Sequence, residues 1–232
     1  MLHSINPANG QTLASFDEPD DGAVDAALDR ARQAQHAWRR QAPAERAKVL
    51  ARVAQVLRRH RDDWGRLATL EMGKPLAEAR AEVEKCAVTC DYYAANAPAM
   101  LDDTQVASNA SDSRVVYDPL GLVLAVMPWN FAFWQAIRAA APAIAAGNGV
   151  VLKHASNVPQ CAQALQQLFA EAGAPAGLFT TLLVGSSRVQ ALIEDRRIAG
   201  VTFTGSSPAG RTIASQAGKA LKKHVLELGG SD

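Results

Sequence analysis

Residues that could do chemistry stand at the ends of apolar segments in the second half of the chain. Asn130 follows LVLAVMP, Lys153 closes GVVLK, Gly205 and Ser206 follow GVTFT, and Glu227 lies near the end of HVLEL. A fixed side-chain amide can stabilise negative charge that develops on a carbonyl oxygen, and a carboxylate can act as a general base. A lysine can reach a ribose or a phosphate. These residues suggest carbonyl chemistry beside a nucleotide if the fold brings the segment ends together.

Each of these residues also has an ordinary structural explanation. Asn130 could cap the helix that follows it, Lys153 could be a surface residue, and Glu227 could be a salt-bridged surface carboxylate. The glycine turn from Gly205 to Gly210 leads into a helix, whose free N–H groups and dipole favour a pyrophosphate. It is not the GxGxxG fingerprint, which the chain lacks. Single residues therefore leave both interpretations open.

The elements that must position these residues alternate between strand and helix. Five apolar segments predict strands: LVLAVMP, GVVLK, LFTTLLV, GVTFT and HVLEL. Between them, helices are expected at about 133–146, 159–172, 187–194 and 208–220. Buried strands that alternate with short helices indicate an α/β fold with a parallel sheet and right-handed crossovers. Ligands bind such sheets at the carboxyl ends of the strands, which is where the candidate residues stand.

The first part of the chain predicts helices with solvent-facing charges. Asp20 or Asp21 is a suitable N-cap for a helix that continues to Arg40, and Pro43 suits the first turn of the next one. Leu76 to Ala97 is a further helical stretch, with Cys86 and Cys90 on its apolar face. From Arg114 the pattern changes, and Val115, Val116 and Tyr117 predict a strand.

The composition excludes several classes of protein. The 232 residues are 48% hydrophobic and 20% charged, with 24 Lys plus Arg against 23 Asp plus Glu. These values argue against a disordered tail and against a strongly basic nucleic-acid binder. The uncharged stretch 119–137 is interrupted by polar residues and prolines, so no membrane span is expected. Three cysteines and no export signal at the start predict a reducing, cytoplasmic location.

The ordered motifs resemble the aldehyde dehydrogenase superfamily over essentially the whole chain. They are LEMGKPLAEA, EVEKCA, PWNF at 128–131, the lysine after GVVLK, FTGSSPAG at 203–210 and ELGG at 227–230. The resemblance implies that an aldehyde is oxidised to an acid through a thiohemiacetal and an acyl-enzyme, with hydride passing to NAD or NADP. It also implies a Rossmann-like, mainly parallel five-stranded sheet with N-terminal helices and part of an oligomerisation hairpin.

The resemblance assigns expected roles to individual residues. Asn130 resembles the side-chain half of the oxyanion hole, and Glu227 resembles the general base. Lys153 matches a residue that contacts the adenosine ribose. The positions next to the cofactor pyrophosphate are matched by Gly205, Ser206 and Gly210, with Trp129 contributing through backbone and packing.

The nucleophile of the family has no counterpart among the residues of this chain. In the family the catalytic cysteine lies beyond the ELGG glutamate, on another domain, and the thiolate is indispensable to an acyl-enzyme. Cys86, Cys90 and Cys161 are expected to be structural. The resemblance therefore implies an N-terminal part of the enzyme, inactive alone and with an apolar face and a sheet edge exposed. The alternative is a non-catalytic NAD(P)-binding or assembly fragment.

The implied organisation has three parts and no catalytic domain. Residues 1–101 form a helical part of the cofactor domain, 102–118 part of an oligomerisation hairpin, and 119–232 the Rossmann-like NAD(P)-binding part. The full-length enzyme is expected to be a homo-oligomer that acts on a small-molecule aldehyde.

Two features refine the expected cofactor and substrate. Ser156 stands where many NAD-preferring members have a glutamate that repels a 2'-phosphate, so NADP should be accepted at least as well as NAD. Phe131, Gln135 and Arg138 should share a helix face with the substrate tunnel. Arg138 is the only charged residue between 119 and 152, and it could grip a distal carboxylate or form an ion pair with the missing half. The motifs also resemble the succinate-semialdehyde dehydrogenase branch.

Three positions depart from the usual family pattern. Ala132 replaces a proline after PWNF, Ser187 replaces a frequent second glycine after Gly185, and Ser231 replaces a lysine after ELGG. None of them removes an expected catalytic role.

Overall fold

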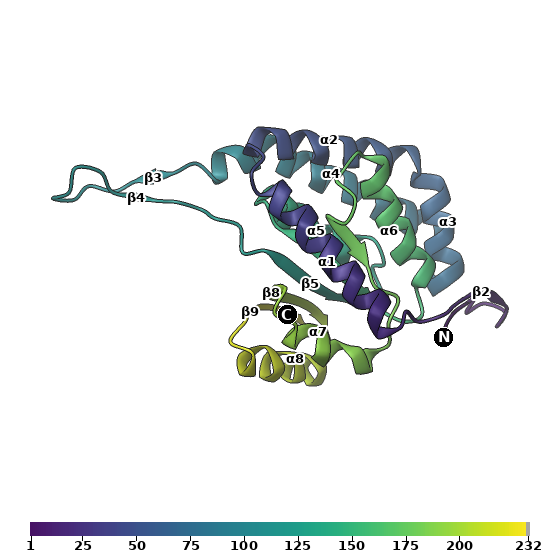
Figure 1. Cartoon of the computed structure of the whole chain (residues 1–232). Coiled ribbons are helices and arrows are strands. Elements are labelled where there is room, and N and C mark those ends of the chain that lie inside the picture. The colour runs from purple at the N-terminus through teal and green to yellow at the C-terminus, as the bar shows by residue number, and fades with distance from the viewer. Residues whose placement is uncertain (231–232) are drawn as a thin grey trace.

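The computed structural model describes residues 1–230, and a five-stranded parallel sheet lies at its centre (Figure 1). The strand order is β7-β6-β5-β8-β9, and every neighbouring pair is parallel. The strands are β5 (Leu122–Met127), β6 (Gly149–His154), β7 (Phe179–Thr181), β8 (Ile198–Gly205) and β9 (Lys223–Leu228). The α/β fold class with a Rossmann-like sheet is confirmed. Ser231, one of the expected departures, lies outside the described residues.

The crossover helices agree closely with the expected ones. They are α5 (Trp134–Ala145), α6 (Pro159–Glu171), α7 (Val189–Glu194) and α8 (Ser207–Lys219), with a short 3₁₀ turn η1 (Ser186–Arg188) before α7. The segment LFTTLLV was expected as one long strand, but β7 contains only three residues. Beyond Thr181 the chain leaves the sheet, and Leu182 and Val184 are buried in the core around α1 and α7 instead.

Four helices precede the sheet. They are α1 (Asp21–Trp38), α2 (Pro43–Arg59), α3 (Arg61–Met72) and α4 (Leu76–Met100). α1 packs on the strands, and the other three pack on the crossover helices α5 and α6. Asp20 is the N-cap of α1, and its Oδ1 accepts from the Ala23 amide at 2.7 Å. Pro43 begins α2 as expected. Gly73, with φ of 80°, ends α3 in the left-handed conformation that glycine tolerates.

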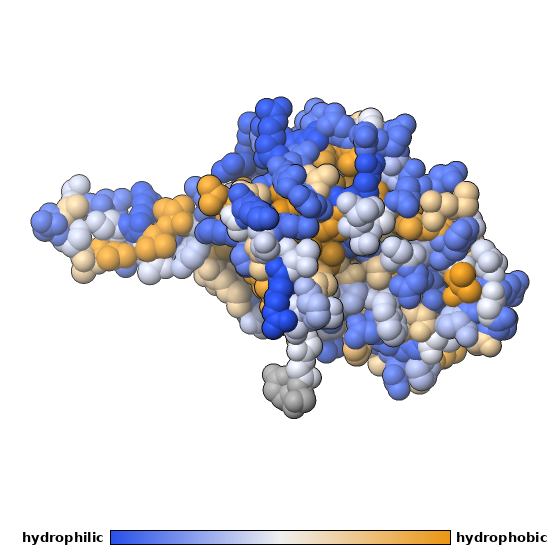
Figure 2. Space-filling view, turned by 90° about the horizontal axis from the view of Figure 1, so that it is seen from below, coloured by the Kyte–Doolittle hydropathy of each residue, from blue (hydrophilic) through white to orange (hydrophobic). Residues whose placement is uncertain are grey.

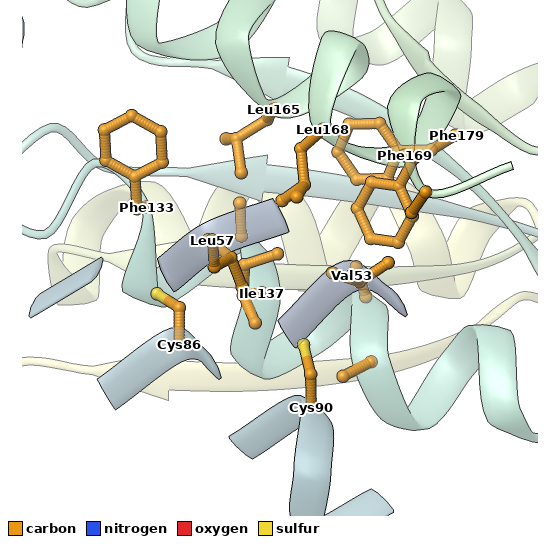
Figure 3. Packing of buried hydrophobic residues seen from close by; sticks show 14 of the residues in the cluster. Val53, Leu57, Cys86, Cys90, Phe133, Ile137, Leu165, Leu168, Phe169 and Phe179 are labelled. Atoms are coloured by element: carbon orange, nitrogen blue, oxygen red, sulfur yellow. The ribbon is translucent and has the colours of Figure 1, made fainter. Parts of the chain in front are cut away.

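Apolar side chains fill both sides of the sheet. On one side, α2 to α6 enclose a large core in which the cysteines of α4 point toward Val53 and Leu57 of α2 (Figure 3). On the other side, α1, α7 and α8 pack on β5 and β8 around Leu28, Leu124 and Ile193. The N-terminal helices therefore belong to the same packed body as the sheet, and contacts from them can reach the strand ends.

Two hairpins complete the described chain. β1 (Leu2–Ile5) and β2 (Thr12–Phe16) are antiparallel and were not expected from the sequence. β3 (Thr104–Gln105) and β4 (Arg114–Val115) form a long arm that leaves the body (Figure 1). Val116 and Tyr117, expected in a strand, are exposed and unpaired, because the arm contacts no second sheet within residues 1–230.

Large apolar side chains are exposed on the arm and near the β9 edge. On the arm they include Val106, Val115 and Tyr117. Figure 2 shows hydrophobic residues on the surface of this arm. Within residues 1–230, β9 pairs with β8 alone, and its Val225 is 58% exposed. Exposed apolar surface and an open strand edge are features that proteins usually cover. Within residues 1–230, no helix has the length and apolar character needed to cross a bilayer.

Candidate active site

The carboxyl ends of β5, β8 and β9 surround a cleft of about 700 Å³. β5 and β8 are neighbours, although β6 and β7 lie between them in sequence, so the cleft opens where the strand order reverses. Ligands of doubly wound sheets bind at this switch point. The cleft is lined by Pro128, Trp129, Asn130, Gln135, Arg138, Thr204, Gly205, Ser206, Glu227, Leu228 and Gly229. Most of the residues expected in the site are therefore brought together.

Asn130 stands in the exposed turn between β5 and α5, at the edge of the cleft. The N-cap position of α5 is Phe133, which makes no side-chain cap hydrogen bond, so Asn130 does not cap this helix. Glu82 of α4 does so instead, because its Oε1 accepts from the amides of Phe133 at 2.8 Å and Trp134 at 3.0 Å. Helix capping therefore does not explain Asn130, which lines the cleft.

Arg138 and Glu227 form an ion pair inside the cleft. The Arg138 Nη1 lies 2.9 Å from Glu227 Oε1, and the two side chains are 31% and 50% exposed. The Arg138 Nη2 also donates to Thr204 Oγ1 at 3.1 Å, and its Nε donates to Gln135 Oε1 at 3.3 Å. The expected ion pair with a missing half is therefore not needed to explain Arg138, since its partner lies within this chain.

The glycine turn prepares the N-terminus of α8 beside the cleft. Ser206 is the N-cap of α8, and no side chain of residues 1–230 caps the helix there. A Cβ on Gly205 would lie 2.5 Å from Cζ of Phe203. Gly210 is buried inside α8 and does not line the cleft; a Cβ there would lie 2.4 Å from Cδ2 of Leu228. Gly210 thus serves close packing of α8 on β9, while the open N-terminus suits an anion.

Lys153 is buried at the end of β6, and Ser156 is exposed in the following turn. Burial lowers the pKa of Lys153, and the nearby Glu18 charge partly offsets this effect. Among residues 1–230, no carboxylate oxygen lies within 4.0 Å of its ammonium. A buried lysine without an ion-pair partner, beside an exposed serine, fits the polar end of a nucleotide. Both residues lie outside the cleft that holds Asn130.

Phe131 differs from the expectation of a shared helix face. It precedes α5, which begins at Trp134, and its carbonyl accepts from the Gln135 amide at 3.1 Å. The ring is 42% exposed and lies under the Lys74 ammonium, 3.6 Å from the ring centroid. Phe131 does not line the cleft, whereas Gln135 and Arg138 do.

The cysteines carry no catalytic character. Cys86, Cys90 and Cys161 are free and buried. Burial raises the pKa of Cys90 to about 12, and it raises the pKa of Cys86 and Cys161 well above the usual value. None of these thiols can supply a thiolate near neutral pH. Within residues 1–230, no group of three or more side chains of the His, Cys, Asp or Glu type is placed to hold a metal ion.

Three buried polar residues behind the Asn130 turn escaped the sequence reasoning. Glu82 is paired with Lys74, and His154 Nε2 lies 2.7 Å from the carbonyl of Ala132. The Ala155 amide donates to His154 Nδ1, so the proton of the neutral ring is on Nε2 and that atom donates to Ala132. The sequence did mark Lys74 and Glu82, because they stand inside the motifs LEMGKPLAEA and EVEKCA. Neither motif indicates which residues these side chains contact.

Comparison with known proteins decides the family. The family model described as the aldehyde dehydrogenase family matches residues 1–232. The chain belongs to the aldehyde dehydrogenase family. A Synechocystis protein described as a probable succinate-semialdehyde dehydrogenase [NADP(+)] is 50% identical over 231 residues, and a Mycobacterium tuberculosis succinate-semialdehyde dehydrogenase [NADP(+)] 1 is 49% identical over 236 residues. Each alignment covers 100% of this chain and 51% of the relative.

Solved structures of family members agree with this fold. The crystal structure of a succinic semialdehyde dehydrogenase from Streptococcus pyogenes in complex with NADP+ superposes with a TM-score of 0.96 at 40% identity. The superposition covers 100% of this chain and 51% of the Streptococcus pyogenes chain. A betaine aldehyde dehydrogenase from Staphylococcus aureus gives a TM-score of 0.91 at 29% identity, over 99% of this chain and 47% of that one. The chain thus spans about half the length of the family members that it matches.

Proposed function

We propose that this chain supplies the cofactor-binding half of an NAD(P)-dependent dehydrogenase that oxidises succinate semialdehyde to succinate. The observation that carries the proposal is the cleft that unites Asn130, Arg138 and Glu227 next to the open N-terminus of α8. In this proposal residues 1–232 alone are inactive, because the three thiols of the chain are buried and protonated. The nucleophile comes from a catalytic domain that follows the cofactor domain.

Asn130 and Glu227 have complementary tasks in the proposed reaction. The Asn130 amide donates a hydrogen bond to the aldehyde oxygen and stabilises the negative charge that grows there. Glu227 accepts a proton from the attacking thiol or, later, from water. Its 50% exposure and its position in the cleft give a water molecule access to the carboxylate.

The cofactor proposal is NADP, with NAD as the second acceptor. When bound, it would accept the hydride that leaves the aldehyde carbon. The residues present fit such a group: α8 offers free N–H groups to the pyrophosphate, and Lys153 is buried without an ion-pair partner among residues 1–230. Ser156 leaves room without negative charge for a 2'-phosphate. Relatives described as NADP(+)-dependent support this choice.

The proposed substrate carries a carboxylate at its far end. Arg138 is the one cation that lines the cleft among the described residues, and a guanidinium binds a carboxylate through charge-assisted hydrogen bonds. The names of the similar proteins support succinate semialdehyde as this substrate. Gln135 positions the guanidinium through its hydrogen bond to Nε.

We also propose the three-part organisation that the resemblance implies. Residues 1–101 and 119–232 form the cofactor domain, which operates in the cytoplasm, and residues 102–118 form an oligomerisation arm. Exposed apolar side chains on β4 and beside β3 and β4, namely Val106, Val115, Val116 and Tyr117, support contact with another subunit. The full-length enzyme is then a homo-oligomer.

Replacement of Arg138 tests the substrate assignment in the full-length enzyme. Arg138→Leu should raise KM for succinate semialdehyde about 10- to 100-fold, the usual effect of losing hydrogen bonds to a charged group. KM for butanal, which has no carboxylate, should change less than about threefold by the same reasoning. Any disturbance of Glu227 acts on both aldehydes alike and appears in kcat.

The same assay, which follows the appearance of NADPH at 340 nm, also tests whether residues 1–232 are inactive alone and whether the full-length protein oxidises aldehydes. Residues 1–232 alone should produce no NADPH but should bind NADP in a fluorescence titration. Equal changes of KM for both aldehydes would refute the carboxylate clamp. Absence of aldehyde oxidation by the full-length protein, with NADP binding intact, would favour a non-catalytic NADP-binding role.

A further inference from the structure

A buried cluster behind the Asn130 turn has no part in the function proposed so far. The turn covers residues 130–133 between β5 and α5, and Asn130 lies on its cleft side. On its other side stand Glu82 and Lys74, whose side chains are 2% and 7% exposed and form an ion pair. Lysine and glutamate side chains are almost never buried to this degree unless they are paired, as these two are.

Each residue after Asn130 is held by a contact from outside the turn. The Phe131 ring lies under the ammonium of Lys74, and the carbonyl of Ala132 accepts from His154. The amides of Phe133 and Trp134 both donate to Glu82 Oε1.

One stacked aromatic pair and one cation–π contact also hold the end of the turn and the start of α5. The Phe133 ring stacks on Trp64 of α3 with 5.8 Å between ring centroids, and the Lys85 ammonium lies 4.1 Å from the centroid of the Trp134 ring. Trp129 and Asn130 are exposed, and no side-chain hydrogen bond from either to residues 1–230 is present. The turn is thus fixed along its length from behind, while the amide itself stays free to meet a ligand.

We propose that Glu82, held by Lys74, is a positioning residue that fixes the Asn130 turn and thereby aims the Asn130 amide at the substrate oxygen. Glu82 replaces the N-cap side chain that α5 lacks, so Asn130 is released from capping and available for the cleft. An amide preorganised in this way stabilises developing charge without reorganising during the reaction. The inference rests on the proposed function, because it assigns Asn130 the oxyanion role.

The electrostatics of the cluster explain why a carboxylate is used here. The N-terminus of a helix carries partial positive charge, which favours an anion at the first free amides. Glu82 Oε1 faces these amides, while Oε2 pairs with Lys74. In Glu82→Gln, the side-chain NH₂ group replaces one carboxylate oxygen. Its hydrogens then face either the Lys74 ammonium or the backbone N–H groups, and both of these are donors. The helix start then loses part of its anchor without any change in side-chain size.

A buried carboxylate of the same kind offers a matched control. Glu71 of α3 is 2% exposed, and its oxygens accept from the amides of Gln160 and Cys161 at the start of α6, both at 2.8 Å. Within residues 1–230, Glu71 forms no hydrogen bond or ion pair with residues 130–133. Glu84, which lies two residues beyond Glu82 and pairs with Arg58 on the surface, controls for a charge change on α4.

Steady-state kinetics of the full-length enzyme test the positioning role. E82Q should lower kcat about 10- to 100-fold with KM for NADP unchanged within about twofold, whereas E71Q and E84Q should retain kcat within about twofold. In the Asn130→Ala background, E82Q should cause little further loss, because its effect passes through the missing amide. Equal additional losses in both backgrounds would show that Glu82 supports stability alone and would overturn the proposal.

Amide hydrogen exchange gives a second readout that does not depend on activity. E82Q should speed exchange of the Phe133 and Trp134 amides at least about tenfold, while E71Q should affect Gln160 and Cys161 instead. Unchanged exchange at 133–134 in E82Q would overturn the proposal even if kcat fell. If the wild-type enzyme shows no dehydrogenase activity, the proposed function is wrong. The exchange experiment still tests whether Glu82 holds the amides of Phe133 and Trp134.

A charge-neutral double variant covers the case in which E82Q folds poorly. K74M/E82Q removes the unpaired ammonium and keeps a side-chain acceptor at position 82. It should recover melting temperature relative to E82Q while kcat stays low, because the anionic acceptor is still missing. Recovery of kcat together with melting temperature would assign the loss in E82Q to folding.

Discussion

At the scale of single residues, the ion pair between Arg138 and Glu227 ties two proposed tasks together. A guanidinium has five N–H groups, and three contacts from Arg138 are made within this chain, to Gln135, Thr204 and Glu227. The remaining N–H groups can bind a substrate carboxylate while Glu227 stays in place. The pair also keeps the carboxylate of Glu227 oriented in the cleft before a substrate arrives.

Ser156 allows a residue-scale prediction about the cofactor. Ser156→Glu in the full-length enzyme should lower kcat/KM for NADP about 100-fold, because a carboxylate beside a 2'-phosphate costs several kcal/mol. The value for NAD should change less than about threefold. Asn157→Glu, one residue further along the same exposed turn, is the matched control for added charge. Similar losses in both variants would show that general repulsion, and not position 156, decides the preference.

At the scale of secondary-structure elements, the loop from α6 to β7 passes unusually close to α1. Gly177 has φ of +91°, and a Cβ there would lie 3.0 Å from the carbonyl oxygen of Arg30. The neighbour is helix backbone, which cannot turn aside as a side chain can. This approach lets α1 lie on the sheet, where Leu28 and Ala31 join the core.

Gly177→Ala should therefore lower the free energy of unfolding by about 2–4 kcal/mol, from left-handed strain and overpacking. Gly218 in α8 is the matched control, because a Cβ there meets no atom within 4 Å and its backbone is helical. Gly218→Ala should raise stability by about 0.5–1 kcal/mol. Urea denaturation of residues 1–232 measures both changes. Equal effects of the two substitutions would contradict the close approach of loop and helix.

At the scale of the whole molecule, the sequence predicts the elements better than the contacts between them. Apolar runs indicate β5, β8 and β9, and a parallel sheet gathers the carboxyl ends of its strands, so Asn130 and Glu227 line one cleft. The ion pair between Arg138 and Glu227 was not expected from the sequence. The β1–β2 hairpin escaped notice, although Asn6, Asn9 and Gly10 form a recognisable turn. The strands are short, and their alternation is weak.

Contacts between segments that are distant in the chain could not be predicted from the sequence. Glu82 reaches Phe133 across 51 residues and Glu71 reaches Cys161 across 90, and no local pattern encodes such pairings. An isolated Glu in an amphipathic helix predicts a solvated residue. Only the packing of α3 and α4 against α5 and α6 places these carboxylates at helix starts.

His154 makes the stability of the whole molecule sensitive to mild acid. Burial is the main reason that its pKa falls from 6.5 to about 4. Above pH 6.5 the ring is neutral in both folded and unfolded chains, so the folded state has its full stability. Between pH 6.5 and 4 only the unfolded chain takes up the proton, and the free energy of unfolding should drop by about 3 kcal/mol from this residue.

The variant His154→Gln keeps a donor for the Ala132 carbonyl but cannot take up a proton in this range. Its unfolding free energy should start lower at pH 7 and fall less steeply toward pH 4 than that of wild type. His36→Gln, at an exposed position of α1, should retain the wild-type fall and serves as the control for loss of a histidine. Urea titrations at half-unit pH steps measure the three profiles. Parallel curves for wild type and His154→Gln would mean that the ring is not held neutral in the core, and that the Ala132 carbonyl is anchored in some other way.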